Sequence, residues 1–380
     1  MKLLQDIVVL DFSQFLSGPS AALRLADMGA QVIKIERPGT GDICRDLYVS
    51  DTMIEGESTI FHAINRNKQS FAANLKDAGD LETIKKLLLK ADMMIHNFRP
   101  GVMQRIGLDY ATVKGINPRI IYGEISGYGD KGPWKNLPGQ DLLVQAVSGL
   151  TWLSNSNDEP TAMGVAIVDI MAGTHLAQGL LAALYQRLST GEGSLVQVSM
   201  LESILDFQFE VLTSFYNDGN EAPQRSKVNN GHAYIAAPYG IYKTIDGYLA
   251  LSMGDVIVLS DLLNCPPLKQ FSEPADWFTK RDSIKQILAV CLENETTDHW
   301  MDVLEAADIW CARVLNYETL MNEKAYQSLN MELLVKTSNG LSVKTTRCPI
   351  RIDGELLVSE RGAPLLGEHN REVKQQFALI

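Results

Sequence analysis

The residue of this 380-residue sequence best placed for chemistry is Asp169, a carboxylate that follows the short apolar run Val165–Val168. After it, apolar residues recur at helical spacing, which predicts a helix that begins at Asp169 and ends in the glycine-containing turn 189–193. Asp169 then has two interpretations. It is either the N-cap of that helix, or a nucleophilic or acid–base carboxylate that the small residues Ala172 and Gly173 leave open to a substrate. This stretch alone does not decide between them.

A second chemical feature is a set of cations that lie near predicted strand ends and loops: Arg37, Arg66, Lys68, Lys76, Arg99 and Arg105. Ligands of parallel sheets bind beyond the carboxyl ends of the strands, so cations gathered there suit a phosphate-bearing ligand. Each of them alone would more often be a solvated surface charge. The sequence has no G-x-G-x-x-G or Walker pattern, which argues against the usual dinucleotide and nucleoside-triphosphate sites.

Composition narrows the class of protein. The net charge of −12 argues against non-specific nucleic-acid binding, and 46% hydrophobic residues suffice for a large core. We expect no membrane span, because Asp169, His175 and Gln178 interrupt the longest apolar run. The first residues read as a strand and not as a signal peptide, so we expect a cytoplasmic protein.

The five cysteines are Cys44, Cys265, Cys291, Cys311 and Cys348. They are an odd number, widely scattered and without a C-x-x-C pair, so we expect no disulfide framework and no metal site. Each is predicted to be a reduced thiol.

The elements that must position these residues form an α/β pattern. The segments 7–12, 21–27 and 31–36 read as strand, helix and strand, which implies a parallel sheet. Further strands are predicted over 92–96, 119–126 and 194–200, with helices over 80–90 and 201–216. After a polar linker over 217–230, a hairpin over 236–253 and helices over 277–292 and 297–307 predict a smaller α+β domain.

Read together, seven blocks of the sequence resemble the class III CoA-transferases, the family of formyl-CoA transferase and carnitine CoA-transferase, which also contains α-methylacyl-CoA racemases. The blocks are SGPSAALRLADMGAQVIKIERPGTGD (17–42), INRNKQSFAANLK (64–76), ADMMIHNFRPGVMQRIGL (91–108), NPRIIYGEISGYGDKGPW (117–134), DLLVQAVSGL (141–150), VDIMAGTHLAQGLLAALYQR (168–187) and APLLGEH (363–369). They occur in the expected order and cover nearly the whole chain.

The resemblance implies a Rossmann-like large domain with a parallel sheet over 1–216, a linker and small α+β domain over 217–326, and a C-terminal segment over 327–380 that returns to the large domain. It implies a homodimer of interlocked chains. It also implies that Asp169 is catalytic: the carboxylate attacks an acyl-CoA to form an acyl-aspartyl anhydride, which CoA thiolate converts to an aspartyl-CoA thioester. A second carboxylic acid then receives the CoA, so the thioester is a substrate and no permanently bound cofactor is expected.

By the same resemblance, CoA contacts eight positions: Leu16, Arg37, Ala73, Lys76, Asn97, Phe98, Arg99 and Arg105. Arg37, Lys76 and Arg105 would meet the phosphates, and Phe98 would pack near the adenine or pantetheine. The family frequently has glutamine where this chain has Leu16, and Gln14 is close enough in sequence to replace it.

Two alternatives remain at this stage. The racemase branch needs a histidine in a Gly-His-Asp segment, where this chain has Gly139-Gln140-Asp141, and glutamine does not accept a proton at neutral pH. The other alternative is a non-catalytic CoA-binding paralogue, against which Asp169 and Gly173 argue.

The acid that receives CoA is only partly indicated. Oxalate-directed members carry consecutive glycines where this chain has 251–255, Leu-Ser-Met-Gly-Asp, which favours other acids, with dicarboxylates such as succinate as candidates. His232, Tyr234 and Tyr239 are candidates for lining the acid pocket.

Overall fold

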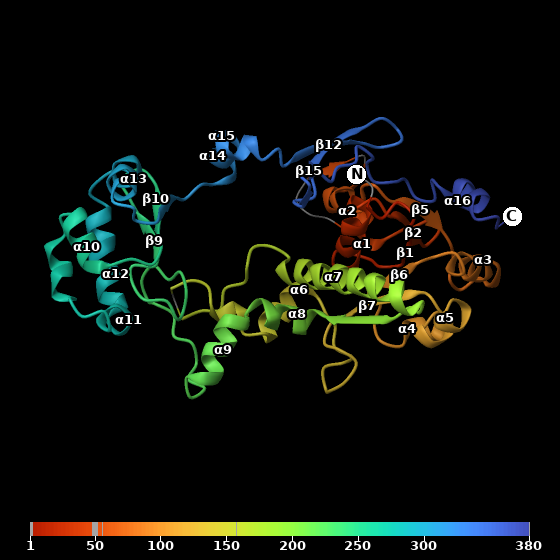
Figure 1. The fold of residues 1–380 in the computed structure, drawn as a ribbon, viewed down its shortest axis with the longest axis horizontal. Coiled ribbons are helices and arrows are strands. Elements are labelled where there is room, and N and C mark those ends of the chain that lie inside the picture. Colours follow the sequence, from red (N-terminus) through yellow and green to blue (C-terminus); the bar gives the residue numbers. More distant parts are fainter. Residues whose placement is uncertain (1–2, 48–51, 55, 157, 380) are drawn as a thin grey trace. The chain divides into compact units, whose positions relative to one another are not determined.

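The computed structural model describes residues 3–47, 52–54, 56–156 and 158–379 and divides the chain into two compact units. Unit 1 comprises Met1–Val144, Ala166–Phe207 and Leu329–Ile380, and unit 2 comprises Gln145–Val165 and Gln208–Ser328. Both are drawn in Figure 1.

The segments 145–165 and 208–216 were expected in the large domain, 1–216, but belong to unit 2. The helix predicted over 201–216 is interrupted at Gln208, which separates α8 (Met200–Phe207) from α9 (Phe209–Asn217). The segment 145–165 is tied to the same unit: Asn230 Nδ2 donates to the Leu153 carbonyl at 3.1 Å, and Asn230 N donates to Ser156 Oγ at 2.8 Å.

Unit 1 is built on a six-stranded parallel sheet of order β5-β2-β1-β6-β7-β8, which confirms the predicted α/β class. Its strands are β1 (Val8–Asp11), β2 (Gln31–Glu36), β5 (Gln69–Ala72), β6 (Met93–His96), β7 (Ile121–Ser126) and β8 (Leu195–Ser199). Strand β5 was not predicted, because Gln69 and Ser70 interrupt its apolar pattern. Strands β1 and β6 are nearly continuous apolar runs, as central strands covered on both faces require, whereas β2, β7 and β8 also carry polar residues.

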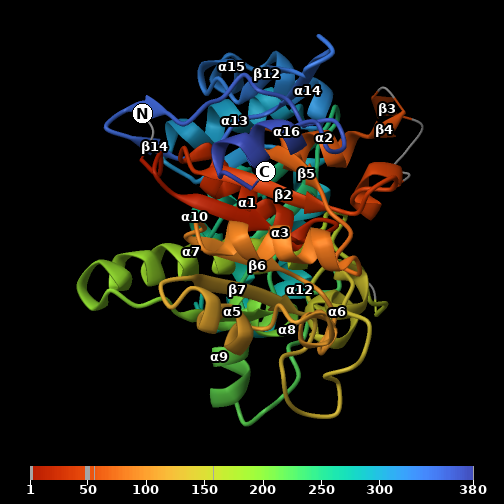
Figure 2. The ribbon, with the colours of Figure 1, turned by 90° about the vertical axis from the view of Figure 1, so that its right-hand side faces the viewer.

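Helices cover both faces of this sheet (Figures 1 and 2). On one face, α3 (Ala78–Leu88), α4 (Val102–Ile106), α5 (Tyr110–Ile116) and α16 (Asn370–Gln376) pack with strand residues such as Leu10, Ile33 and Tyr122 in one buried core. On the other face lie α1 (Ser17–Asp27) and α7 (Ile167–Thr190), which pack against each other. Gly123 of β7 faces α7, since a Cβ there would lie 3.1 Å from side-chain atoms of Leu176 and Leu180.

By length and composition alone, α7 also satisfies the measure of a membrane span, which buried core helices satisfy as well. Its residues Val168, Ala172, Leu176 and Leu180 are buried inside unit 1.

The smaller elements of unit 1 are η1 (Ile43–Asp46), β3 (Met53–Ile54), β4 (Glu57–Ser58), α2 (Thr59–Asn65), α6 (Asp141–Val147, which continues into unit 2), β12 (Glu332–Lys336), β13 (Ser342–Thr346), β14 (Arg351–Ile352) and β15 (Glu355–Leu356).

Unit 2 contains a three-stranded antiparallel sheet of order β11-β10-β9 and a set of helices. The strands are β9 (Gly240–Lys243), β10 (Tyr248–Leu251) and β11 (Cys311–Arg313), and β9 and β10 form the predicted hairpin. The helices are η2 (Leu150–Trp152), α9, α10 (Val256–Leu262), η3 (Pro266–Gln270), α11 (Asp276–Thr279), α12 (Arg281–Leu292), α13 (Thr297–Ala306), α14 (Tyr317–Asn322) and α15 (Lys324–Ser328). One buried core, which includes Tyr242, Leu259, Leu288 and Trp300, joins the sheet to the helices.

The expectation of five reduced cysteines was wrong. Cys265 and Cys291 form a disulfide across 26 residues of sequence, between the residue before η3 and the last turn of α12. Cys44, Cys311 and Cys348 are free thiols. The pairing depends on how η3 and α12 pack, which spacing in the sequence does not show.

Candidate functional site

Asp169 lies in the first turn of α7 and is not its N-cap. The helix begins at Ile167, two residues before the predicted start, and its N-cap residue Ala166 has no capping side chain. The cap comes from Asp141, whose Oδ2 accepts the backbone N–H groups of Val168 at 2.8 Å and Asp169 at 3.1 Å. The Asp169 carboxylate is therefore left free for other partners.

Those partners lie at the start of α1. The hydroxyl and the backbone N–H of Ser17 act on the Asp169 carboxylate as hydrogen-bond donors that lower its pKa. Ser17 Oγ in turn accepts a bond of 3.2 Å from Asn97 Nδ2, in the loop after β6. The carboxylate thus lies near the carboxyl ends of β1 and β6, the edge at which ligands of parallel sheets bind.

The surroundings of Asp169 bring the pKa of its carboxyl close to neutral pH. Burial, followed by the negative charge of Asp141, raises the pKa of Asp169 from 3.8 to about 6, and the Ser17 hydrogen bonds oppose the rise. A carboxylate with this pKa is mainly ionised at pH 7 and more basic than an exposed aspartate, which suits a nucleophile.

Two glycines allow the backbone to close around this carboxylate. A Cβ at Gly173 would lie 2.1 Å from Ser20 Oγ and 2.6 Å from the Ser17 carbonyl oxygen, so only glycine lets α7 approach α1 this closely. A Cβ at Gly18 would lie 2.3 Å from Ser13 Cβ. The small residue expected at 173 therefore serves helix packing directly beside the site.

The residues expected to contact CoA follow the carboxyl ends of four neighbouring strands. Leu16 follows β1, Arg37 follows β2, Ala73 and Lys76 follow β5, and Asn97, Phe98, Arg99 and Arg105 follow β6. Arg37, Lys76, Arg99 and Arg105 are exposed, whereas Ala73 is buried and the others are half-buried. Asn97 is joined to the Asp169 carboxylate through Ser17.

Two of the six cations singled out in the sequence are not available to a ligand. Arg66 is buried and forms a salt bridge with Asp27. Lys68 is also buried; it donates to Asp11, to Asn65 and to the Pro19 carbonyl, and burial, partly offset by Asp11, lowers its pKa to about 8. Both cations bind residues of α1, Arg66 the Asp27 carboxylate and Lys68 the Pro19 carbonyl. The cations left exposed to a ligand are Arg37, Lys76, Arg99 and Arg105.

A polar cavity of about 440 Å³ opens at the carboxyl ends of β6, β7 and β8. Phe98 and Arg99 line it together with His96, Tyr122 and Lys135. It therefore brings two of the expected CoA contacts to one wall of unit 1.

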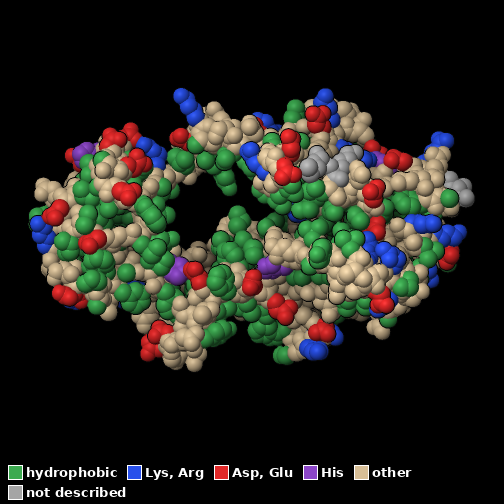
Figure 3. All heavy atoms as spheres, viewed as in Figure 1, with side chains coloured by type: hydrophobic (Ala, Val, Ile, Leu, Met, Phe, Trp, Pro, Cys, Tyr) green, Lys and Arg blue, Asp and Glu red, His purple; other side chains and the backbone are tan. Residues whose placement is uncertain are grey.

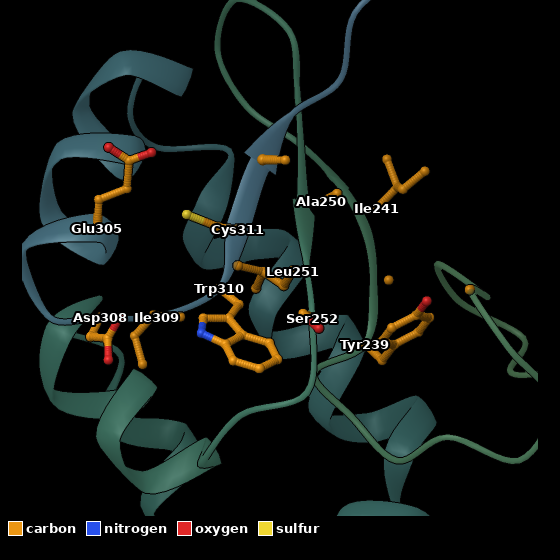
Figure 4. A pocket seen from close by; sticks show the side chains of 13 residues that line it. Tyr239, Ile241, Ala250, Leu251, Ser252, Glu305, Asp308, Ile309, Trp310 and Cys311 are labelled. Atoms are coloured by element: carbon orange, nitrogen blue, oxygen red, sulfur yellow. The ribbon is translucent and has the colours of Figure 1, made fainter. Parts of the chain in front are cut away.

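Of the three residues expected to line an acid pocket, His232, Tyr234 and Tyr239, only Tyr239 lines the cavity of unit 2 shown in Figure 4. This cavity of about 630 Å³ is also lined by Ser252 and Trp310. His232 instead pairs with Glu210, Nε2 to Oε1 at 2.6 Å. The Tyr234 hydroxyl is buried without a hydrogen-bond partner among the residues that the structure describes.

Sequence reasoning missed two residues of the site. Ser17 carried no signal beyond its place in a matched block. Asp141 was noticed only as part of the segment that argues against a racemase, and its role as the cap of α7 depends on a contact across 28 residues.

The sequence and the fold are both similar to those of known proteins. A family model described as CoA-transferase family III matches residues 4–370. The acetyl-CoA:oxalate CoA-transferase of Acetobacter aceti is 34% identical, over 98% of this chain and 95% of that protein. The succinyl-CoA:glutarate CoA-transferase of Mus musculus is 31% identical, over 99% and 86%. A crystal structure of an aspartate-to-alanine variant of Rv3272 from Mycobacterium tuberculosis has a TM-score of 0.84 at 27% identity, over 97% of this chain and 98% of that one.

Proposed function

This chain belongs to CoA-transferase family III and is a CoA-transferase, and we propose that it moves CoA from an acyl-CoA to a carboxylic acid through covalent intermediates on Asp169. The observation that carries the proposal is the carboxylate itself. It is half-buried at the carboxyl edge of the sheet, and its pKa is raised to about 6. It does not cap α7, because Asp141 accepts the first backbone N–H groups of that helix.

The proposed reaction has four steps that conserve the thioester. An Asp169 oxygen attacks the thioester carbonyl carbon, the C–S bond breaks, and an acyl-aspartyl anhydride and CoA thiolate form. The thiolate attacks Asp169 Cγ, releasing the first acid and leaving an aspartyl-CoA thioester. The second acid's carboxylate attacks Cγ and expels the thiolate, and a second acyl-aspartyl anhydride forms. The thiolate then attacks the acyl carbon of that anhydride, giving the new acyl-CoA and freeing the Asp169 carboxylate. Water does not enter the balance, and it must be kept out because it would hydrolyse each of these intermediates.

Ser17 has a defined role in this sequence. Its hydroxyl and N–H already donate to the carboxylate, and the same donors would face the negative charge that develops on the Asp169 oxygen when Cγ is attacked. Because the N–H belongs to the first residue of α1, it has no partner inside that helix and is available for this purpose.

We propose that CoA lies along the carboxyl edge of the sheet. Exposed Arg37, Lys76 and Arg105 meet its phosphates, and Phe98 packs beside the adenine or pantetheine. Arg99, Asn97, Ala73 and Leu16 complete the set. The support for this placement is that all eight residues follow the ends of adjacent strands β5, β2, β1 and β6.

The proposed acids are short dicarboxylates. The names of the two relatives contain oxalate and glutarate, which are both of this class. The segment 251–255 lacks the glycine run expected of oxalate-directed members, which favours longer diacids such as succinate and glutarate.

We propose a homodimer of interlocked chains. Its support is the number of large apolar side chains that both units leave exposed; Figure 3 shows one face of them. On α7, Tyr185 and Leu188 are 79% and 80% exposed, and Phe209 on α9 is 66% exposed. Single apolar residues on a surface need no explanation, but Tyr185 and Leu188 are three residues apart on one helix and form an exposed apolar strip of the kind that a partner chain covers. The cytoplasmic location remains a prediction.

The proposal is tested by incubating the protein with acetyl-CoA or succinyl-CoA and a panel of carboxylic acids, and detecting new CoA thioesters by mass. We expect exchange with at least one short dicarboxylate and none with the Asp169→Asn variant. Exchange that survives in this variant would contradict the assigned nucleophile. α-Proton exchange into a 2-methylacyl-CoA without CoA transfer would favour the racemase alternative.

A further inference from the structure

The loop between β1 and α1, residues 12–16, is held by buried and half-buried side chains. Asn97 binds both backbone groups of Gln14: its Oδ1 accepts the N–H at 2.8 Å and its Nδ2 donates to the carbonyl at 2.7 Å. Ser13 is held likewise, its N–H by Asp11 Oδ1 at 3.0 Å and its carbonyl by Lys34 Nζ at 2.8 Å. The loop therefore has little freedom of its own.

Phe15, the next residue, has an unfavourable backbone conformation. Its φ is 61°, in the left-handed region that bulky residues rarely occupy. Its side chain is 40% exposed, so core packing does not explain the conformation. Such strain persists only where the surroundings enforce it, and it is frequent at functional sites.

The group that holds Phe15 is Asp42, which is 1% exposed and follows the loop after β2. Asp42 Oδ1 accepts the N–H of Phe15 at 3.2 Å and the N–H of Cys44 at 2.9 Å. Its other oxygen lies 2.8 Å from Lys34 Nζ, and Lys34 is itself buried. Asp42 thus joins the strained residue to the buried charges beneath the sheet edge.

Two residues after Phe15 comes Ser17, which packs against α7 so closely that a Cβ at Gly173 would lie 2.6 Å from its carbonyl oxygen. Its hydroxyl and N–H act as hydrogen-bond donors to the Asp169 carboxylate and lower its pKa. We propose that Asp42 is a positioning residue for CoA transfer: by holding Phe15 in the left-handed conformation, it aims the Ser17 donors at Asp169. Asp42 touches no reacting atom in this account and acts only through the loop. The proposal rests on the proposed function of Asp169.

The test begins with Asp42→Asn, which preserves the shape of the side chain. An amide has one oxygen, and the charged Lys34 competes for it, so the Phe15 N–H loses its acceptor. We expect kcat to fall on the order of a hundredfold, as misplacement of catalytic groups by about 1 Å commonly causes. Since the Ser17 hydrogen bonds lower the pKa of Asp169, their loss should also move the acidic limb of the kcat profile to higher pH. The matched control is Asp46→Asn, an exposed aspartate of the 3-10 helix η1, of which Asp42 is the N-cap; it should behave as wild type.

A second substitution separates positioning from general damage. Adding Phe15→Gly to Asp42→Asn should restore most of kcat, because glycine adopts φ near 61° without strain. Adding Phe15→Ala should not, although it also removes the ring. Equal recovery by glycine and alanine, or an Asp42→Asn variant as active as Asp46→Asn, would overturn the proposal.

If Asp42→Asn does not fold, as judged by circular dichroism, Phe15→Val and Phe15→Gly decide the matter in the presence of Asp42. Valine is more strongly disfavoured in the left-handed region, so it should lose kcat while glycine retains it; equal activity refutes the inference. Wild-type turnover is measured first, so a failure of CoA transfer itself is distinguished from a failure of this loop proposal.

Discussion

Replacing Asp169 with asparagine should make the protein more stable at neutral pH while removing its activity. In the folded chain, burial and the charge of Asp141 raise the pKa of Asp169 from 3.8 to about 6. A shift of about 2 units corresponds to about 3 kcal/mol of unfolding free energy lost when the group is ionised. Asparagine has no charge to bury, and its amide oxygen still accepts the Ser17 hydrogen bonds.

The sign of the pH dependence follows from linkage. Between pH 3.8 and about 6 the folded state binds more protons than the unfolded state, so the wild-type protein loses stability as the pH rises through this window. The advantage of Asp169→Asn should therefore be complete above pH 7, about 3 kcal/mol, and fall to about 1 kcal/mol at pH 4.5.

The assay is thermal unfolding of both proteins at pH 7.5 and 4.5. A gain of this size should raise the midpoint by on the order of 5 °C at pH 7.5 and much less at pH 4.5. Asp46→Asn, which removes an exposed carboxylate, serves as the control and should shift neither midpoint appreciably. An Asp169→Asn variant that is less stable than wild type at pH 7.5, or equally stabilised at both pH values, would refute the reasoning.

Four further outcomes are expected. Asp141→Asn removes the negative charge beside Asp169 but retains an oxygen for the α7 N–H groups, so the acidic limb of the pH–rate profile should move to lower pH; an unmoved limb would contradict the coupling. Gly173→Ala would place a Cβ 2.1 Å from Ser20 Oγ, and should reduce kcat at least tenfold in steady-state kinetics, whereas Gly115→Ala, where the Cβ meets nothing within 4 Å, should not. Lys76→Ala should raise the KM for acyl-CoA several-fold with little change in kcat, and the difference should shrink as salt is added. Reducing the Cys265–Cys291 disulfide should lower the free energy of unfolding by about 2–4 kcal/mol and so lower the thermal midpoint, and the Cys265→Ser/Cys291→Ser variant should show no response to reductant.

The parts of the fold that the sequence predicted are those set by local pattern. The strands β1, β2, β6, β7 and β8 were found because each contains closely spaced β-branched or other apolar residues, a signal that is local in the sequence. β5 was missed because Gln69 and Ser70 are polar; they are buried in the sheet because partners from the C-terminal segment bind them, Glu372 accepting from Gln69 and Ser70 Oγ accepting the N–H of Gly367.

The sequence predicted the central residue of the candidate site but not the residues that contact it. Asp169 was identified by its place before a helical pattern and by the family blocks around it. Its release from the capping role depends on Asp141, and its donors come from Ser17, both of which reach it only through the tertiary fold. For the same reason Arg66 and Lys68 looked like ligand cations in the sequence but are buried beside Asp27 and Asp11.

The most direct test of the central claim is to trap the intermediate on the protein. The enzyme is incubated with an acyl-CoA, quenched with hydroxylamine, digested and sequenced by mass spectrometry. If Asp169 carries an activated acyl group or CoA during turnover, the peptide that contains it will bear a hydroxamate at that residue, dependent on acyl-CoA and absent from Asp169→Asn. A hydroxamate on another carboxylate, or turnover with none on Asp169, would contradict the account.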